Sequence, residues 1–597
     1  GGGMQAGAAA MEASRQVSIY AIPRQKYEQK PPSYADVSRQ APRTLIVLCT
    51  ACPTLEELVE IKALREDLSQ LPTVCKVKCI SQACTAEGWQ EISQVAQDIS
   101  PNRILIGACM PYAYVPKISK LGAALSLDPA FIQVVDIYTS TFSQVLENNV
   151  LEKQILTSLS MAVAELQGAE PSTEREVRQV SDTALVVGGG LAGMTAAMAI
   201  ADQGFKVCLV EKGDDLGGTA LKVHYTLEGH DPQKYLLDLR EDVQKHPLIH
   251  LCTNSRVSLS RGSAGRFQTM IASEDEALTL EHGVTVLATG GHEFKPYDFY
   301  GYGSKERVMT QSELEKQIAS GQLNANELQT VAMIQCVGSR EEPRNYCSRI
   351  CCSAALKNAL KLKSRNPELN VYIFYRDIMS YGFAESYYTQ ARKLGVTFIR
   401  YDPEQKPAVS FEGEKPVITA LDPILGKELS IAADLLILST GIVPNEADEL
   451  AEIFGVPINQ DGFFQEAEPK WRPVEFFKQG IYLCGLAHSP RNMPESIASA
   501  KAAAQSALRI LARKEIKGSR ITAEVKHTLC ALCTRCVEAC PYEARYIDTD
   551  QNKIVVDSLL CQGCGSCAAV CPNSASILKE FQDAQIMSEI DAALGYI

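Results

Sequence analysis

The sequence lacks a long uninterrupted apolar run, an excess of basic residues, and an initial segment of basic followed by apolar residues. A long uncharged stretch, residues 183–201, carries four glycines near its middle, which is typical of a loop in a soluble fold and not of a membrane-spanning helix. The net charge of −13 makes the surface repel phosphate backbones. We therefore expect a cytoplasmic protein with no direct membrane span and no nucleic-acid partner.

Cysteine is the residue type that the chain has in excess. There are 21 cysteines among 597 residues, whereas the 46% hydrophobic and 22% charged fractions are those of an ordinary globular protein. Most of them fall into three groups, at 49–109, 336–352 and 530–571. In a chain expected to be cytoplasmic, such groups indicate metal or redox ligands and not disulfides. Cys208, Cys252 and Cys484 stand apart, and we interpret them as buried core residues.

The order of predicted elements indicates an α/β protein of several domains. Apolar runs predict strands at 44–49 and 103–109, with helices over 55–68, 87–96 and 140–167. We expect an extended arm over 1–42, a small α/β domain over 43–178, a Rossmann-type cofactor-binding domain over 179–515, and a two-cluster ferredoxin domain with a helical tail from about residue 576 over 516–597.

Two copies of the motif Cys-x2-Cys-x2-Cys-x3-Cys-Pro lie near the end of the chain. In this motif the first three thiolates bind one [4Fe–4S] cluster, and the fourth binds the other cluster. The predicted ligand sets are Cys530, Cys533, Cys536 and Cys571 for one cluster, and Cys561, Cys564, Cys567 and Cys540 for the second. Two zinc sites are the alternative, but zinc needs neither the third cysteine nor the proline. Clusters that exchange a ligand must lie close together, so this domain is predicted to conduct electrons.

A dinucleotide-binding loop is predicted at Gly188-x-Gly190-x-x-Gly193, between a strand and a helix, with Glu211 at the end of the next strand. The glycines allow a tight turn, a close approach of a pyrophosphate, and close packing of helix and strand, while Glu211 can accept hydrogen bonds from ribose hydroxyls. A glycine-rich turn in an unrelated α/β fold is the alternative.

FAD is predicted in preference to NAD from segments that resemble flavoproteins of the disulfide-reductase type. Leu486 stands where that class commonly has Asp, so the ribityl contact must differ. The predicted cofactor contacts are Gly188, Gly190, Leu191, Ala192, Gly193, Glu211, Lys212, Gly217, Gly218, Thr219, Thr289, Gly290 and Gly485. That class carries a second glycine-rich unit for NAD(P)H, but the matching strand at 331–340 has no such glycines and carries Cys336.

The chain resembles the HdrA family, the iron–sulfur flavoproteins of heterodisulfide reductase, from about Thr44 to the ferredoxin region. The resemblance is carried by Cys336-Val-Gly-Ser-Arg340, by Tyr346-Cys-Ser-Arg-Ile-Cys-Cys352, and by Tyr375-Arg-Asp-Ile378. It implies a thioredoxin-reductase-like FAD domain with a third [4Fe–4S] cluster, held by Cys336, Cys347, Cys351 and Cys352. Core thiols or a reducible pair are the alternative for these four residues.

The resemblance also implies a cluster in the N-terminal domain, held by Cys49, Cys84 and Cys109 together with Cys52. Here Cys49-x2-Cys52-Pro53 replaces the family's Cys-x-Cys-Gly, and Cys75 and Cys79 are further candidates. The best-known members insert another two-cluster ferredoxin domain, whereas residues 216–284 of this chain contain only Cys252.

The function that this resemblance implies is that of an oxidoreductase component that relays electrons, and bifurcates them at FAD, between other redox subunits of a heterodisulfide-reductase-like complex. A hetero-oligomer is expected, and its dimerisation is left open. The cofactors carry the chemistry, so no catalytic side chain is assigned. Two alternatives are kept: a self-contained NAD(P)H-dependent flavin reductase, and a non-catalytic scaffold that contains clusters.

Overall fold

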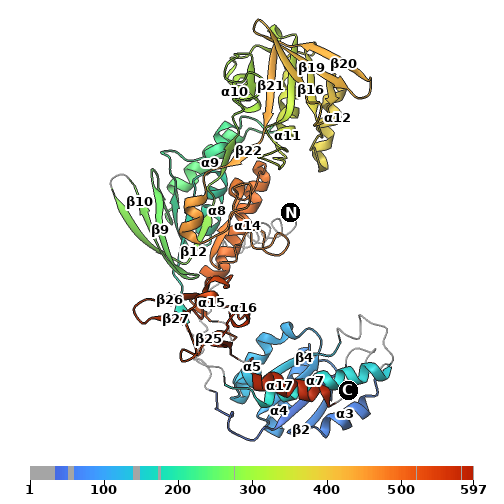
Figure 1. Ribbon diagram of the computed structural model, residues 1–597, viewed down its shortest axis with the longest axis vertical. Coiled ribbons are helices and arrows are strands. Elements are labelled where there is room, and N and C mark those ends of the chain that lie inside the picture. The colour runs from blue at the N-terminus through green and yellow to red at the C-terminus, as the bar shows by residue number, and fades with distance from the viewer. Residues whose placement is uncertain are drawn as a thin grey trace. The chain divides into compact units, whose positions relative to one another are not determined.

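The computed structural model describes residues 34–50, 59–138, 148–171, 177–273, 276–518, 521–579, 581 and 583–595. Two compact units can be distinguished (Figure 1). Among the described residues, one unit comprises those within 178–516, and the other combines those within 34–177 with those within 517–595. Among the described helices, none has both the length and the apolar character needed to cross a bilayer.

The first sheet of the 178–516 unit is parallel and has five strands. Their order is β23 (Ile481–Leu483), β12 (Val284–Leu287), β6 (Thr183–Val187), β7 (Lys206–Val210) and β8 (Ile249–Cys252). One face is covered by α8 (Leu191–Ala201), α9 (Pro232–Lys245) and α14 (Met493–Leu511). Because α8 is rich in alanine and glycine, α14 packs closely against it. The other face packs against β9 (Arg256–Ser263), β10 (Arg266–Ala272), β11 (Ala277–His282) and α13 (Asp448–Phe454).

The second sheet of this unit repeats the arrangement. Its parallel order is β14 (Val308–Thr310), β21 (Leu435–Thr440), β15 (Thr330–Val337), β16 (Asn370–Tyr375) and β17 (Val396–Arg400). The helices are α10 (Gln311–Ser320), α11 (Cys351–Arg365) and α12 (Glu385–Lys393), and the opposite face carries β18 (Ala408–Glu412), β19 (Lys415–Asp422) and β20 (Lys427–Ala432). The short pair β13 (Gly291–Glu293) and β22 (Ile442–Pro444) joins the two halves. This is the Rossmann-type α/β class that the sequence predicted.

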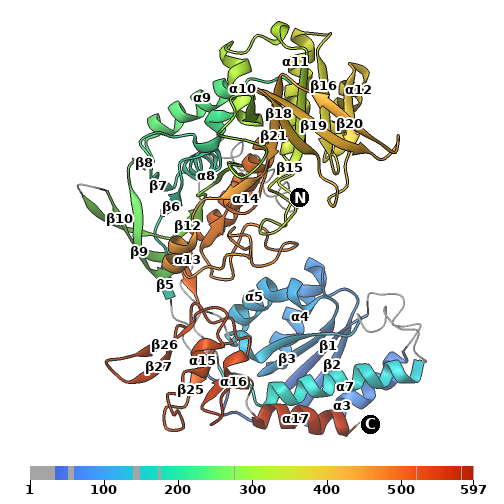
Figure 2. The same ribbon diagram turned by 45° about the horizontal axis from the view of Figure 1, so that its top comes forward.

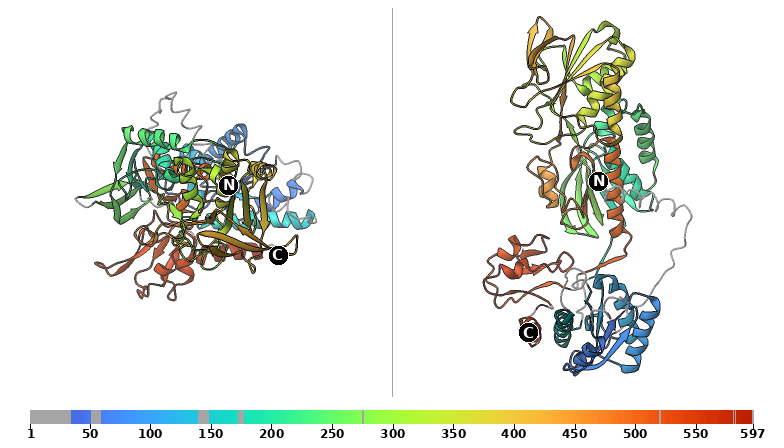
Figure 3. Two further views of the ribbon diagram at one scale, coloured as in Figure 1. Left: turned by 90° about the horizontal axis from the view of Figure 1, so that it is seen from above. Right: turned by 90° about the vertical axis from the view of Figure 1, so that its right-hand side faces the viewer.

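The other unit contains a parallel sheet in the order β2 (Val74–Ile80), β1 (Thr44–Cys49), β3 (Arg103–Ala108) and β4 (Ile132–Asp136). One face packs against α3 (Ile61–Ser69) and α7 (Asn148–Gln167), and the other against α4 (Ala86–Ile99) and α5 (Val115–Leu125). Figure 3 shows this blue sheet and its helices from two further sides. The predicted starts of two helices, at residues 55 and 140, lie outside the described residues, and the fourth strand was not predicted.

The cysteine-rich segment belongs to the same unit. It consists of two antiparallel pairs, β25 (Ala523–Val525) with β28 (Ser576–Leu578) and β26 (Arg545–Asp548) with β27 (Lys553–Val556), and of the short helices α15 (Arg535–Glu538) and α16 (Ser566–Ala569). The short strands β5 (Val177–Gln179) and β24 (Glu515–Lys517) pair with each other. The helical tail begins at Asp583 and not near residue 576, because residues 576–578 pair as β28. This last helix, α17 (Asp583–Leu594), lies along α7 (Figure 2), where the Gln585 side chain donates to the Gly168 carbonyl at 3.1 Å.

Candidate cofactor sites

The glycine-rich loop follows β6 and opens α8. Gly188 has a φ of 109°, and a Cβ there would lie 2.3 Å from the Ala288 carbonyl oxygen. A Cβ on Gly193 would lie 1.8 Å from the Gly188 carbonyl oxygen. Both positions therefore require glycine for the fold itself, because the turn and the close helix–strand approach leave no room for a side chain.

Gly190 is different, and it tests whether a dinucleotide fits this loop. Its backbone, with φ −73° and ψ −178°, is one that any residue adopts, and a Cβ there would have no atom of the described residues within 4 Å. Neither conformation nor packing within the chain explains this glycine. It stands at the N-cap of α8, where free N–H groups and the helix dipole favour a phosphate. A pyrophosphate passing close to the backbone does explain it, so the residues present fit the cofactor.

Glu211 is positioned by the same loop. Its Oε2 accepts the Gly189 N–H at 2.6 Å and its Oε1 accepts the Gly213 N–H at 2.8 Å. Each carboxylate oxygen keeps a second lone pair, which is what a ribose hydroxyl would use. The neighbouring Lys212 is exposed to solvent.

The remaining predicted contacts gather around the start of α8. The Gly217 N–H donates to the Gly189 carbonyl at 2.9 Å, and a Cβ on Gly218 would lie 3.2 Å from the Gly190 Cα. A Cβ on Gly485 would lie 2.6 Å from the Ala192 Cβ, and the Gly485 N–H donates to Ser499 at 3.0 Å. Two hydrogen bonds position further predicted contacts: the Thr219 hydroxyl donates to the Gly291 carbonyl, and the Thr289 carbonyl accepts from the Asn445 side chain. Gly290 follows Thr289, and Leu191 is buried.

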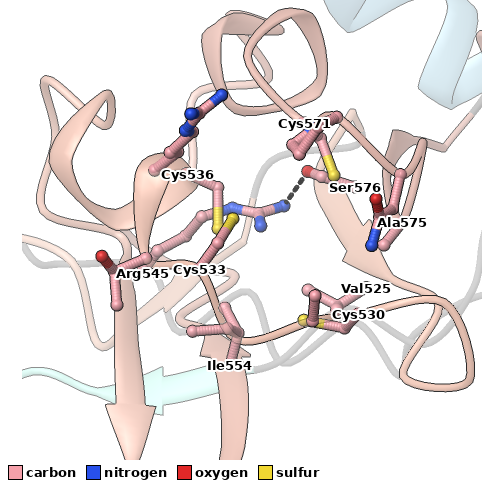
Figure 4. A pocket seen from close by; sticks show the side chains of 14 residues that line it. Val525, Cys530, Cys533, Cys536, Arg545, Ile554, Cys571, Ala575 and Ser576 are labelled. Atoms are coloured by element: carbon pink, nitrogen blue, oxygen red, sulfur yellow. Dashed lines mark hydrogen bonds between the residues drawn. The ribbon is translucent and has the colours of Figure 1, made fainter.

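The C-terminal cysteines line two cavities, each of which combines ligands from both motifs. Cys530, Cys533, Cys536 and Cys571 surround the first cavity (Figure 4), and Cys561, Cys564, Cys567 and Cys540 surround the second. In the described part of the chain, no three Cys, His, Asp or Glu side chains converge on a single-ion site. A zinc ion needs its sulfurs about 2.3 Å from one point. Cavities ringed by four thiols suit a larger inorganic group such as a cluster.

Arg545 lies between these thiols and is a residue that sequence reasoning missed. It lines both cavities, is 3% exposed, and donates to the Ser576 hydroxyl at 2.6 Å (Figure 4). Its Nε and Nη1 are buried, and no hydrogen-bond partner for them exists among the described residues. A buried cation with unused donors fits an environment of negatively charged clusters. At Cys571, burial opposes ionisation, but the N–H groups of residues 573, 575 and 576 lower the pKa of the thiol, which favours the ligating thiolate.

Replacing Arg545 by Met should lower the reduction potential of both C-terminal clusters by on the order of 60 mV, the one-electron equivalent of a tenfold shift. Reduction adds negative charge, which the buried guanidinium stabilises. Redox titration followed by EPR measures both potentials. Arg535 is exposed and lines only the first cavity, so Arg535→Met is the matched control and should shift one cluster slightly. Equal effects of the two variants would contradict the role assigned to Arg545.

A third group of cysteines lies at the end of the central strand of the second sheet. Cys336 is the second-last residue of β15, while Cys351 and Cys352 are the first two residues of α11. Burial and the neighbouring Cys352 raise the pKa of Cys336 to about 11. Cys347 contributes to this increase, whereas Arg340 opposes it. The Cys352 thiol donates to the Asp377 carbonyl at 3.7 Å. The structure thus brings together all four predicted ligands of the central cluster.

The backbone around these four cysteines is strained. Cys336, Arg340 and Arg349 have φ values of 60°, 62° and 59°, in the left-handed region that non-glycine residues rarely adopt. Such strain persists where the surrounding structure imposes it, and it concentrates at functional sites. Cys336, Cys351 and Cys352 are buried, and burial raises the pKa of Cys336, so as thiolates these residues would need a cationic group such as iron among them.

Three of the N-terminal cysteines also meet. Cys49 ends β1, Cys84 follows β2 and Cys109 follows β3, so all three lie at the carboxyl ends of parallel strands, where α/β sheets bind their ligands. Burial raises the pKa of Cys109, and the neighbouring Cys49 and Cys84 raise it further. Burial also raises the pKa of Tyr114, which lies beside these cysteines.

Among the other N-terminal candidates, the two that the structure describes do not join this group. Cys52 lies outside the described residues. Cys75 lies at the opposite end of β2, where its thiol donates to the Thr44 carbonyl at 3.3 Å. Cys79 pairs with Leu48 and not with Cys49, so its side chain lies on the other face of the sheet.

Comparisons with known proteins match the segments that contain the glycine-rich loop and the C-terminal cysteines. A family model described as "NAD(P)-binding Rossmann-like domain" matches residues 186–240, and one described as "4Fe-4S dicluster domain" matches residues 506–575. The chain is 29% identical to HdrA, the CoB–CoM heterodisulfide reductase iron-sulfur protein, of Methanocaldococcus jannaschii, over 93% of this chain and 99% of that protein. It is 29% identical to the HdrA component of the H(2):CoB–CoM heterodisulfide,ferredoxin reductase of Methanothermobacter marburgensis, over 93% and 98%.

Among solved structures, thioredoxin reductases of T. acidophilum and Lactococcus lactis align with TM-scores of 0.38 and 0.39, both at 16% identity. They cover 55% and 56% of this chain, and 97% and 99% of their own chains.

Proposed function

Given that this chain is an iron–sulfur flavoprotein of the oxidoreductases, similar to HdrA of heterodisulfide reductase along 93% of its length, we propose that it relays electrons between partner subunits of a larger complex. The finer proposal is that it bifurcates them at FAD, dividing electron pairs between two acceptors. The partners would be other redox subunits of a heterodisulfide-reductase-like complex, in the cytoplasm, with functional domains at 43–178, 179–515 and 516–597.

The proposal rests on the cysteines that lie between the central strand of the second Rossmann-type sheet and the helix that follows it. In a two-domain flavin reductase, the loop between its central strand and the following helix binds the nicotinamide cofactor. Here Cys336 is the second-last residue of β15, and the first turn of α11 carries Cys351 and Cys352. Thiols occupy the place where the pyrophosphate of NAD(P)H would lie. We propose that they hold the third cluster, so that electrons enter and leave through clusters and not through a nicotinamide.

The loop between β15 and α11 is tied directly to the segment on the flavin side. Arg349, two residues from Cys347, donates to the Pro490 carbonyl at 2.8 Å and pairs with Glu495 at 3.1 Å. Glu495 caps α14 and also accepts the Tyr381 hydroxyl at 2.7 Å. These bonds fix the thiol-bearing loop against the residues that follow Gly485. FAD, when bound, exchanges electrons either in pairs or singly, whereas each cluster carries one.

The relatives support a role within a complex. Their names describe subunits of reductases that act on the CoB–CoM heterodisulfide, some with hydrogen or ferredoxin. The alignment with the M. jannaschii protein runs over 653 residues, more than this chain contains, so that relative has residues with no counterpart here. We propose that electrons supplied there by an inserted domain reach this chain through a different protein of the complex, and that Cys49, Cys52, Cys84 and Cys109 hold a fourth cluster.

Cofactor content and reduction of the isolated chain test the proposal. Anaerobically purified protein should contain about one FAD and about sixteen irons, four for each cluster. Dithionite should reduce the clusters, and NAD(P)H should leave the flavin oxidised. Bleaching of the flavin by NAD(P)H would instead identify a self-contained reductase, and clusters that resist dithionite would identify a scaffold. Cys351→Ala should lose about four irons, whereas Cys484→Ala, at a fully buried cysteine outside every group, should lose none.

A further inference from the structure

Two cysteines that are 44 residues apart in the sequence meet in the first sheet of the 178–516 unit. Cys208 lies on β7 and Cys252 ends the adjacent strand β8, and their sulfur atoms are 3.7 Å apart. Cys208 is 2% exposed, as expected of a core residue, whereas Cys252 is only partly buried. Because β7 and β8 are parallel neighbours with Cys208 opposite His250, the two thiols lie on the same face. Neither belongs to any of the candidate cluster sites.

The two thiols have unequal environments. The hydrogen bond from Cys208 lowers the pKa of Cys252, against the effect of burial, and His250 lowers it further. The same hydrogen bond, together with burial, raises the pKa of Cys208. The pair thus consists of a partly buried thiol whose pKa is lowered and a buried thiol beside it whose pKa is raised. This is the arrangement of an attacking and a resolving cysteine.

We propose that Cys208 and Cys252 form a reversible dithiol–disulfide pair that is oxidised by low-molecular-weight disulfides. The Cys252 thiolate attacks one sulfur of the small disulfide, which forms a mixed disulfide and releases one thiolate. Cys208 then loses its proton and attacks the Cys252 sulfur, which releases the second thiolate and closes the bond between the two strands. Two electrons pass from the protein to the small disulfide, and one proton goes to solvent.

This pair lies directly beneath the residue assigned to the cofactor ribose. The Cys252 carbonyl accepts the Glu211 N–H at 2.8 Å, and Cys208 lies on β7, which ends immediately before Glu211. A disulfide requires the sulfurs to approach to about 2.05 Å, so its formation would draw together the ends of β7 and β8 that position Glu211. We infer that oxidation of the Cys208–Cys252 pair weakens the retention of FAD, and this inference rests on the proposed FAD site.

Peptide mapping tests the pair without reference to electron transfer. The full chain with its cofactors is incubated anaerobically with oxidised glutathione, alkylated in denaturant, and digested without reduction. A Cys208–Cys252 cross-linked peptide should appear in most chains and disappear after dithiothreitol. Cys208→Ala should accumulate a glutathione adduct on Cys252, while Cys252→Ala should leave Cys208 unmodified. Full alkylation of both cysteines in the wild type would overturn the pair.

Flavin release tests the coupling to the cofactor site separately. Oxidised wild-type protein should lose at least several-fold more FAD on gel filtration than reduced protein, and Cys208→Ala should show no such difference. Cys484→Ala is the matched control and should behave as the wild type. A cross-linked chain that retains all of its FAD would overturn the coupling, while a chain without FAD in either state would contradict the proposed function and leave the mapping result intact.

Discussion

Replacing Gly190 by Asp is expected to give a folded chain that retains less than about a tenth of the wild-type FAD, equivalent to at least about 1.4 kcal/mol of binding free energy. The backbone of Gly190 suits any residue, and in the described part of the chain no atom lies within 4 Å of its Cβ position, so the side chain should not disturb the fold. A carboxylate at the N-cap of α8 would occupy the position of the pyrophosphate and repel its charge. Flavin absorbance per chain after gel filtration measures the loss.

Two further substitutions separate binding from folding. Gly190→Ala adds only a methyl group, so it should keep the thermal stability of the wild type and reduce FAD content less than Asp does. Gly193→Ala places its Cβ 1.8 Å from the Gly188 carbonyl and should destabilise the unit itself, measured by circular dichroism. Full FAD content in Gly190→Asp would show that the cofactor does not pass this loop.

The parts that could be predicted from the sequence are those whose physical cause is local. The loop at 188–193 needs glycine at positions fixed by one turn, and the strand before it and the helix after it lie within about thirty residues of chain. The two C-terminal motifs likewise encode their cavities in short spacings, and the structure places Cys571 with Cys530 as the motif predicts. Apolar runs such as 44–49 indicated buried parallel strands for the same reason.

What could not be predicted depends on contacts between distant segments. Cys208 and Cys252 meet only because of the register between β7 and β8, which no local pattern specifies. Arg545 resembles any other strand residue in the sequence, yet the fold buries it between two sets of thiols. The packing of α17 against α7 joins segments more than 400 residues apart. In each case tertiary packing, and not local propensity, determines the role of the residue.

Removing Cys536 together with Cys571 should lose the same iron as removing either one, whereas removing Cys536 together with Cys540 should lose twice as much. Cys536 and Cys571 line one cavity although they belong to different motifs, while Cys540 lines the other cavity although it is only four residues from Cys536. The alanine pair at 536 and 571 should therefore lose about four irons per chain, and the pair at 536 and 540 about eight. Iron analysis of anaerobically purified protein measures both.

The opposite result would follow if each motif held its own cluster, because Cys536 and Cys540 would then share one set of irons. If loss of one cluster unfolded the whole domain, both clusters would be lost and the iron count would not separate the two ligand sets. Serine variants address this, since serine can leave an oxygen ligand in place of the thiolate. Cys536→Ser and Cys571→Ser should change the EPR signal of the same cluster, and Cys540→Ser that of the other. If the two clusters do exchange their fourth ligand, the chain segments that bind them cannot separate without breaking an iron–sulfur bond. Their spacing would then be fixed by covalent ligation, which is what rapid electron transfer between them requires.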